Sequence, residues 1–182
     1  MITRKDRKCC IKGCKNRFIP RSITHKVCSP ECSAIIGKKV TADNEKKVTA
    51  ARKEAIKSKS DHLREAQIVF NAYIRARDAG QPCISCQRSS GAKINAGHYL
   101  SVGSHPELRF EELNNNLQCE HCNTYLSGNQ LEYRKGLIAK IGIEKVGWLE
   151  SKHEAKKYTI DEIKEIKAKY KQKIKEINNG HS

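Results

Sequence analysis

The chain has 182 residues, of which 36 are Lys or Arg and 20 are Asp or Glu, so its formal net charge is +16. With 37% hydrophobic, 5% aromatic and 31% charged residues, it has too little apolar material for one large core, and its folded parts should need cross-links. No stretch approaches the roughly 20 apolar residues of a membrane span, and the basic N-terminus is unlike a secretory signal. We therefore expect a soluble protein of the cytoplasm that does not bind membranes.

The positive charge is concentrated at the two ends of the chain. Residues 1–32 carry 9 basic and 2 acidic side chains, residues 33–62 carry 8 and 4, residues 63–151 carry 10 and 9, and residues 152–182 carry 9 and 5. A nearly neutral middle between basic flanks suits a clamp around a site that handles a long polyanion. Nucleic acid is the default partner, because Lys and Arg release counterions when they neutralise phosphates; solvated helix faces are the alternative.

The first predicted element is a small finger over residues 1–33, which is short, rich in turn residues and studded with cysteines. In a reducing cytosol, cysteines at such spacings hold zinc more often than they form disulfides. A site of four thiolates has no open coordination position, so its role is structural. The set comprises Cys14, Cys28, Cys32 and either Cys9 or Cys10, of which we take Cys9.

Residues 34–62 follow as a basic segment of Ala, Lys and Glu with only scattered apolar residues. A helix formed here has no apolar stripe to bury, so we expect a helical or flexible linker without a core.

A central domain is expected over residues 63–151. Apolar residues recur at helical spacing over 63–79, and this helix ends before Gly80. Short apolar pieces at 94–102 and 108–110, broken by turn residues, predict a two-stranded hairpin with a long loop, and two short helices should follow over 131–141 and 143–150.

Two Cys-x2-Cys pairs bracket the predicted hairpin. Each pair presents two thiolates from one tight turn, so four sulfurs can meet around a tetrahedral zinc ion. The pairs are Cys83 with Cys86 and Cys119 with Cys122. A plain zinc ribbon has 15 to 20 residues between its two pairs. The two pairs of this chain are farther apart in the sequence, so a further segment is inserted between them.

The last segment, residues 152–182, begins a helix at a capping box formed by Thr159 and Glu162. Isoleucines and Tyr170 recur along it in a heptad-like stripe that must be covered. Either the helix folds back on the central helices, which we favour, or a second copy covers it in a homodimer.

Within the insertion, His98 follows Gly97, and Asn114 stands five residues before Cys119. Asn123 comes just after the second pair, directly behind the last cysteine. This order resembles the ββα-metal (His-Asn-His, HNH-like) nucleases, in the variant with Asn at the third position. The arrangement is also similar to endonuclease VII of the T-even phages. Over most of the chain the motifs resemble the NinG/Rap recombination endonucleases of lambdoid phages. They are CSPEC at 28–32, PCISC at 82–86, AGHY at 96–99, LRF at 108–110, QCEHCN at 118–123, SGN at 127–129, YR at 133–134 and YTI at 158–160.

The resemblance implies an α+β protein with a small zinc-stapled ββα-metal core, flanking helices and an N-terminal four-cysteine finger. It implies a phage-encoded, metal-dependent DNA endonuclease that cuts branched intermediates such as Holliday junctions and D-loops in the bacterial cytoplasm. The cofactors would be two structural Zn²⁺ ions and a catalytic Mg²⁺ or Mn²⁺. A homodimer would suit the two equivalent cuts of a four-way junction.

In this scheme His98 is the general base and Asn114 orients its imidazole through a side-chain or backbone contact. Asn123 supplies a hard oxygen to the cation. Related nucleases often have an Asp beside the base, where this chain has Gly97, so Glu111, Glu112 or the phosphate itself would complete the shell. His98 as a cation ligand is an alternative.

Three basic residues near this site, Arg109, Arg134 and Lys135, are candidates for gripping DNA phosphates. Two other functions stay open. One is a non-catalytic zinc-finger protein that binds branched DNA or recombination proteins. The other is a transcription regulator, although nothing in the sequence resembles a helix placed to read the major groove.

Overall fold

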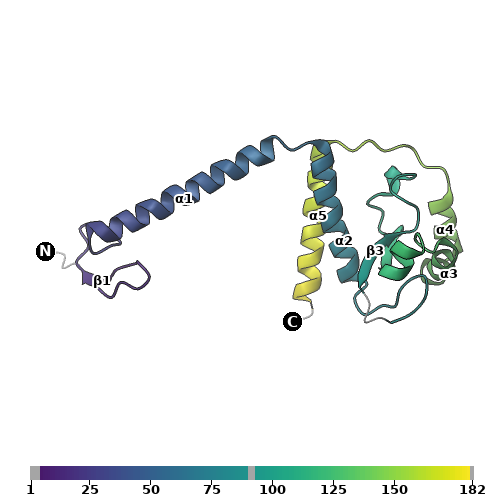
Figure 1. The fold of residues 1–182 in the computed structure, drawn as a ribbon, viewed down its shortest axis with the longest axis horizontal. Helices are drawn as coiled ribbons and strands as arrows, with labels where there is room; N and C mark the ends of the chain where they lie inside the picture. Colours follow the sequence, from purple (N-terminus) through teal and green to yellow (C-terminus); the bar gives the residue numbers. More distant parts are fainter. Residues whose placement is uncertain (1–4, 90–92, 181–182) are drawn as a thin grey trace. The chain divides into compact units, whose positions relative to one another are not determined.

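The computed structural model describes residues 5–89 and 93–180 and divides the chain into two compact units, Met1–Lys57 and Ser58–Ser182 (Figure 1). Helices combine with two small antiparallel sheets, which confirms the α+β class. None of the helices in the described part of the chain has both the length and the apolar character needed to cross a membrane. The finer division into four segments stays a prediction.

The first unit consists of a short hairpin, β1 (Arg7–Lys8) and β2 (Arg17–Phe18), followed by the long helix α1 (Pro30–Ala55). Ser29 caps α1 by accepting a hydrogen bond from the backbone N–H of Cys32, and Pro30 occupies the first turn, where its missing N–H costs nothing. No residue of α1 is buried, as the lack of an apolar stripe predicts. The segment is nevertheless one continuous helix, because Ala, Lys and Glu are good helix formers.

The second unit contains four α-helices and a two-stranded sheet. Its elements are α2 (Lys59–Arg77), β3 (Ile94–His98), the 3-10 turn η1 (Pro106–Leu108), β4 (Asn115–Cys119), the π-helical turn η2 (His121–Tyr125), α3 (Gln130–Ile141), α4 (Ile143–Glu150) and α5 (Ile160–Asn179). The hairpin is present, but the expectation that residues 108–110 belong to it is wrong. Leu108, the last residue of η1, and Phe110, two residues later, are both buried core side chains, which explains their apolar character without a strand.

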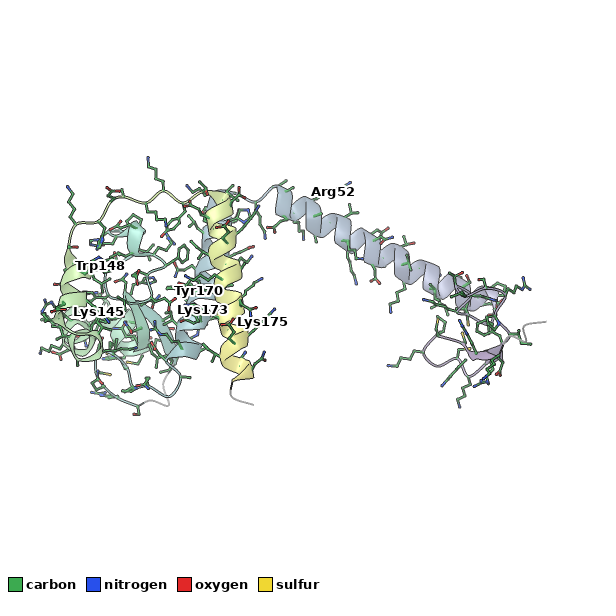
Figure 2. The ribbon with its side chains drawn as sticks, turned by 180° about the vertical axis from the view of Figure 1, so that it is seen from behind. Arg52, Lys145, Trp148, Tyr170, Lys173 and Lys175 are labelled. Carbon is green, nitrogen blue, oxygen red and sulfur yellow. The ribbon has the colours of Figure 1, made fainter. Side chains whose placement is uncertain are left out.

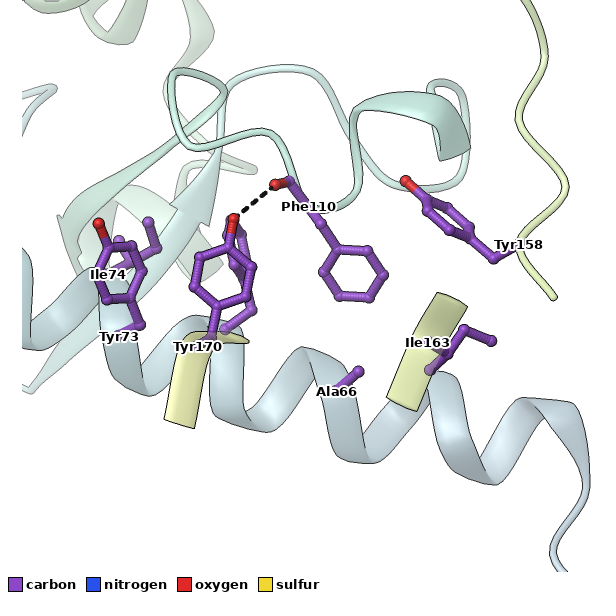
Figure 3. Close-up of a cluster of buried hydrophobic side chains, with 8 residues drawn as sticks. Ala66, Tyr73, Ile74, Phe110, Tyr158, Ile163 and Tyr170 are labelled. Atoms are coloured by element: carbon purple, nitrogen blue, oxygen red, sulfur yellow. Dashed lines mark hydrogen bonds between the residues drawn. The ribbon is translucent and has the colours of Figure 1, made fainter. Parts of the chain in front are cut away.

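Helix α5 folds back on α2, so the stripe of the last helix is covered within one chain. Their shared core is built largely from aromatic rings (Figure 3). The Phe70 and Tyr170 rings pack edge to face at 4.7 Å between centroids, and the Tyr170 hydroxyl donates to the carbonyl of Phe110. In Figure 2, Tyr170 and Lys173 lie on the side of α5 that faces the rest of this unit, whereas Lys175 points away from it.

A second core joins α3 and α4 to the loop that follows β3. Tyr133, Leu137, Val146 and Leu149 are fully buried there. Tyr99 packs beside Tyr133 with ring centroids 5.4 Å apart, so both tyrosines contribute to this core. The sheet therefore lies between two cores, with α2 and α5 belonging to one and α3 and α4 to the other.

A buried carboxylate ties α2 to the sheet and to α3. Asp78 accepts hydrogen bonds from the backbone N–H of Leu117 at 3.2 Å, from Arg77 at 2.7 Å and from Lys140 at 3.0 Å. Burial alone would raise the pKa of Asp78, but its two cationic partners outweigh burial and lower it. The carboxylate is therefore charged, and both of its oxygens accept hydrogen bonds.

We expect Asp78→Ala to lower the free energy of unfolding by about 3–5 kcal/mol, because it leaves two cations and a buried N–H without their acceptor. Urea unfolding of the zinc-loaded protein measures this. The exposed pair of Glu132 with Lys135 is the control: Glu132→Ala should change stability by less than about 1 kcal/mol. Equal losses in the two variants would show that Asp78 has no special structural role.

Candidate functional site

Four cysteines of the first unit converge in the described structure. The ligand atoms of Cys9, Cys14, Cys28 and Cys32 all lie within 4.8 Å of one another, whereas Cys10 is exposed and outside the group. The backbone N–H of Ile11 is the main cause that lowers the pKa of Cys9 to about 7, which favours the thiolate that binds metal. This cluster could hold a zinc ion, with Cys9 as the fourth ligand.

The second unit holds a matching cluster around the sheet. The ligand atoms of Cys83, Cys86, Cys119 and Cys122 also lie within 4.8 Å of one another. Burial would raise the pKa of Cys83, but backbone N–H donors, that of Cys86 first, lower it to about 7. Cys119 is the last residue of β4 and pairs across the sheet with Ile94, the first residue of β3. A metal ion bound here would clamp the end of the hairpin at which β3 begins and β4 ends.

His98 stands at the other end of the same hairpin. It is the last residue of β3 and pairs in register with Asn115, the first residue of β4. Its ring nitrogen Nε2 lies 3.1 Å from the carbonyl oxygen of Arg109 and 3.2 Å from the carboxamide nitrogen of Asn115. The imidazole is thus fixed by one backbone group and one side chain of the segment that returns to the sheet.

These contacts determine which nitrogen of His98 carries the proton. A carbonyl oxygen can only accept a hydrogen bond, so Nε2 is the protonated nitrogen and Nδ1 keeps its lone pair. A protonated Nε2 calls for the oxygen of the Asn115 carboxamide, and that oxygen, Oδ1, is buried without another partner among the described residues. Turning the amide would pair Oδ1 with Nε2, and it would move the NH₂ group to the buried position that Oδ1 now occupies.

The expected role of Asn114, to orient His98 through a side-chain or a backbone contact, stays a prediction. Its side chain does not contact His98 but is fully buried, accepts a 2.8 Å hydrogen bond from the backbone N–H of Leu100 and donates to the carbonyls of Leu100 and Leu108. Its own carbonyl accepts from the backbone N–H of Tyr99. Asn114 therefore holds together the two ends of the loop between His98 and Arg109.

Asn123 comes from η2 and lies against β3. Its side-chain oxygen is 3.0 Å from the point where Gly97 would carry a Cβ atom. This contact places the Asn123 carboxamide beside Gly97, the residue that precedes His98 in β3. Tyr133 of α3 fixes this strand end by donating a 2.8 Å hydrogen bond to the carbonyl of Gly97.

The acidic candidates for a cation site are engaged elsewhere. Glu112 pairs with Lys173 and accepts hydrogen bonds from Tyr73 and Tyr170. Glu111 accepts from the backbone N–H of Leu113. Neither carboxylate is recorded in contact with His98 or Asn123 in the described part of the chain.

The three basic candidates differ in their partners. Arg134 forms two hydrogen bonds to the carboxylate of Glu150, at 2.7 and 3.0 Å. Lys135 is exposed and forms an ion pair with Glu132 one helical turn away. Arg109 makes one long hydrogen bond to Gln67 at 3.4 Å, and partial burial lowers its pKa, so it would gain most from a phosphate partner.

Sequence reasoning missed three residues of this site: Asn115, Tyr133 as an anchor of the strand end, and Gln118, which lies beside Gly97. Asn115 sits next to Asn114 in a run of three asparagines, and only the register of the sheet shows which one faces His98. The hydrogen bond of the Tyr133 hydroxyl to Gly97 depends on the position of α3.

Comparisons with known proteins agree over nearly the whole chain. The family described as "Bacteriophage Lambda NinG protein" matches residues 1–180. A protein ninG of Escherichia phage lambda is 39% identical over 97% of this chain and 95% of its own length, and one of Salmonella phage P22 is 38% identical over 97% and 96%. No solved structure matches the chain. The chain is therefore a member of the bacteriophage NinG family.

Proposed function

We propose that this protein is a metal-dependent DNA endonuclease that cuts branched recombination intermediates, Holliday junctions and D-loops. The observation that carries the proposal is the place of His98 at the end of the hairpin, where its Nε2 lies 3.1 Å from the carbonyl oxygen of Arg109. A His oriented in this way at the end of a hairpin, with a carboxamide oxygen beside the same strand end, fits the ββα-metal scheme that the sequence resembles.

In the proposed mechanism, Nδ1 of His98 takes a proton from the water that attacks the scissile phosphate. Oδ1 of Asn123 offers an oxygen of the kind that Mg²⁺ and Mn²⁺ prefer, so the residue present fits such a cation in ligand type. A bound cation would stabilise the charge on the phosphate and on the leaving oxygen. Asn114 and Tyr133 keep the strand end and the loop in place, so that the base and the ligand stay fixed.

The two cysteine clusters are proposed to bind structural Zn²⁺. Donors to sulfur support this assignment: the side chain of Asn129 lies 3.6 Å from the Cys122 sulfur, and that of Asn16 lies 3.7 Å from the Cys28 sulfur. Burial is the largest cause that raises the pKa of Cys122, and the Asn129 contact opposes it by favouring the thiolate, the form that zinc requires.

DNA binding is proposed to rest on the basic flanks more than on the three residues near the site. Helix α1 contains Lys38, Lys39, Lys46, Lys47, Arg52 and Lys53, and none of its residues is buried. Arg52 extends from α1 into the open in Figure 2. Lys171 and Lys175 of α5 have no ion pair in the described part of the chain, and so are available to phosphates. Selectivity for branched DNA comes from the resemblance alone, since phosphate contacts carry no sequence information.

A second candidate, a non-catalytic protein that binds branched DNA or recombination proteins, is favoured by one observation. Gly97 provides no carboxylate next to the base, and the nearby glutamates are committed to other partners.

The experiment that separates the two candidates compares a synthetic four-way junction with a linear duplex of the same sequence. The zinc-loaded protein should cut the junction in Mg²⁺ or Mn²⁺ and leave the duplex intact, as read on a denaturing gel. Tight junction binding without any cut strand would establish the non-catalytic alternative.

The acid limb of the cleavage rate should report His98. Burial lowers the pKa of this imidazole below its usual 6.5, although the Arg109 carbonyl opposes the shift. A base is active when unprotonated, so the rate should be flat near neutral pH and fall only as the pH drops through a value below 6.5. Single-turnover rates over pH would test this, and an acid limb centred above 6.5 would mean that another group is the base.

A further inference from the structure

The side chain of Gln118 is fully buried in the middle of β4, and its orientation is fixed by its own hydrogen bonds. Its Nε2 lies 2.6 Å from the carbonyl oxygen of Gly128 and 2.8 Å from the hydroxyl of Ser85. A carbonyl oxygen accepts and cannot donate, so the NH₂ group must be on this side. The amide oxygen Oε1 consequently points the other way, toward β3.

The amide oxygen of Gln118 is buried, and it has no hydrogen-bond donor among the residues that the structure describes. Leaving a buried acceptor unsatisfied costs free energy, and an ordered water or ion is the usual explanation when a native fold keeps one. An apolar side chain could fill this space without that cost, so the presence of a polar atom here needs an explanation.

The Gln118 oxygen Oε1 points toward Gly97 of β3. It lies 2.2 Å from the point where a Cβ atom on Gly97 would be, and Oδ1 of Asn123 lies 3.0 Å from the same point. Two carboxamide oxygens from β4 and η2 therefore converge on the place that glycine leaves open. A side chain at position 97, including an acidic one, would force the Gln118 side chain to shift from its present position.

We infer that Gln118 supplies a ligand oxygen for the divalent cation of the proposed site, together with Asn123, in place of a carboxylate at position 97. This inference rests on the proposed function. Oxygen ligands from amide groups suit Mg²⁺ and Mn²⁺, which keep several waters when the protein gives them few ligands. Two neutral oxygens make a weak site on their own, so the bound DNA phosphate completes the coordination.

The test measures Mn²⁺ binding to the zinc-loaded full-length protein by the electron paramagnetic resonance signal of free Mn²⁺, with and without a junction. Gln118→Met keeps the bulk but removes the oxygen, and it should weaken Mn²⁺ binding by at least about tenfold. The matched control is Ser85→Ala, which removes a partner of Nε2 but leaves Oε1 in place, and it should bind Mn²⁺ like the wild type. Equal Mn²⁺ affinity in wild type and Gln118→Met would overturn the inference.

A measurement on the wild-type protein covers the case in which Gln118→Met does not fold. The diamagnetic ion Mg²⁺ should shift the side-chain carbonyl ¹³C NMR signals of both Gln118 and Asn123 as it saturates the site. If only the Asn123 signal shifts, Gln118 is not a ligand, and the proposed nuclease still stands provided that the junction is cut. If neither signal shifts and the junction stays uncut in Mg²⁺ and Mn²⁺, the proposed function fails as well.

Discussion

His98→Ala is expected to reduce junction cleavage by about 10²- to 10⁴-fold, the range that a general base contributes. Junction binding should persist, because the imidazole contacts Arg109 and Asn115 and not the basic flanks that carry the charge. Single-turnover cleavage and a gel-shift titration on the same junction measure the two properties separately.

The matched control for this variant is His121→Ala. His121 is exposed, lies between the two cysteines of the second Cys-x2-Cys pair and is not one of the four clustered ligands. It should cut the junction at the wild-type rate. If the His98 and His121 variants cleave equally well, the assignment of His98 as the base is wrong, whatever the activity of the wild type.

Loss of zinc from the second cluster, that of Cys83, Cys86, Cys119 and Cys122, should unfold the second unit. Structural zinc sites contribute on the order of 10 kcal/mol, which is comparable with the whole net stability of roughly 5–15 kcal/mol of a small domain. Cys119→Ser removes the ligand at the end of β4 and should therefore abolish cooperative unfolding of residues 58–182 as well as cleavage. Native mass spectrometry and thermal unfolding followed by circular dichroism measure zinc content and folding.

Cys10→Ser is the control for that variant, since Cys10 is exposed and lies outside both clusters. It should retain two zinc ions and unfold like the wild type. A Cys119→Ser protein that keeps its cooperative transition would mean that packing around Tyr133 and Leu137 holds the hairpin without metal.

The helices of the second unit could be predicted from the sequence because each has a local signal. The capping box of Thr159 and Glu162 starts α5, and both of its hydrogen bonds are present. Gly142 separates α3 from α4, as the periodicity of the apolar residues suggests. The two cysteine sets could also be predicted, since the spacing of thiolates within a turn is itself a local property.

The details of the site could not be predicted in this way, because they depend on groups without a sequence pattern. The carbonyl of Arg109 that fixes His98 is a backbone group, and any residue could provide it. The run of asparagines gives no sign that Asn114 holds the loop while Asn115 faces the imidazole. Likewise, Gly97 reads as a missing acid in the sequence, and only the fold shows the Gln118 oxygen beside it.

The most direct test of the account is the fate of a labelled four-way junction incubated with the zinc-loaded wild-type protein and Mg²⁺. We expect symmetric cuts near the branch point, no cuts when a chelator removes Mg²⁺ from the protein that still holds zinc, and renewed cutting when Mg²⁺ is added back. A junction that is bound but stays intact in Mg²⁺ and in Mn²⁺ would contradict the central claim that His98 and Asn123 form a hydrolytic site.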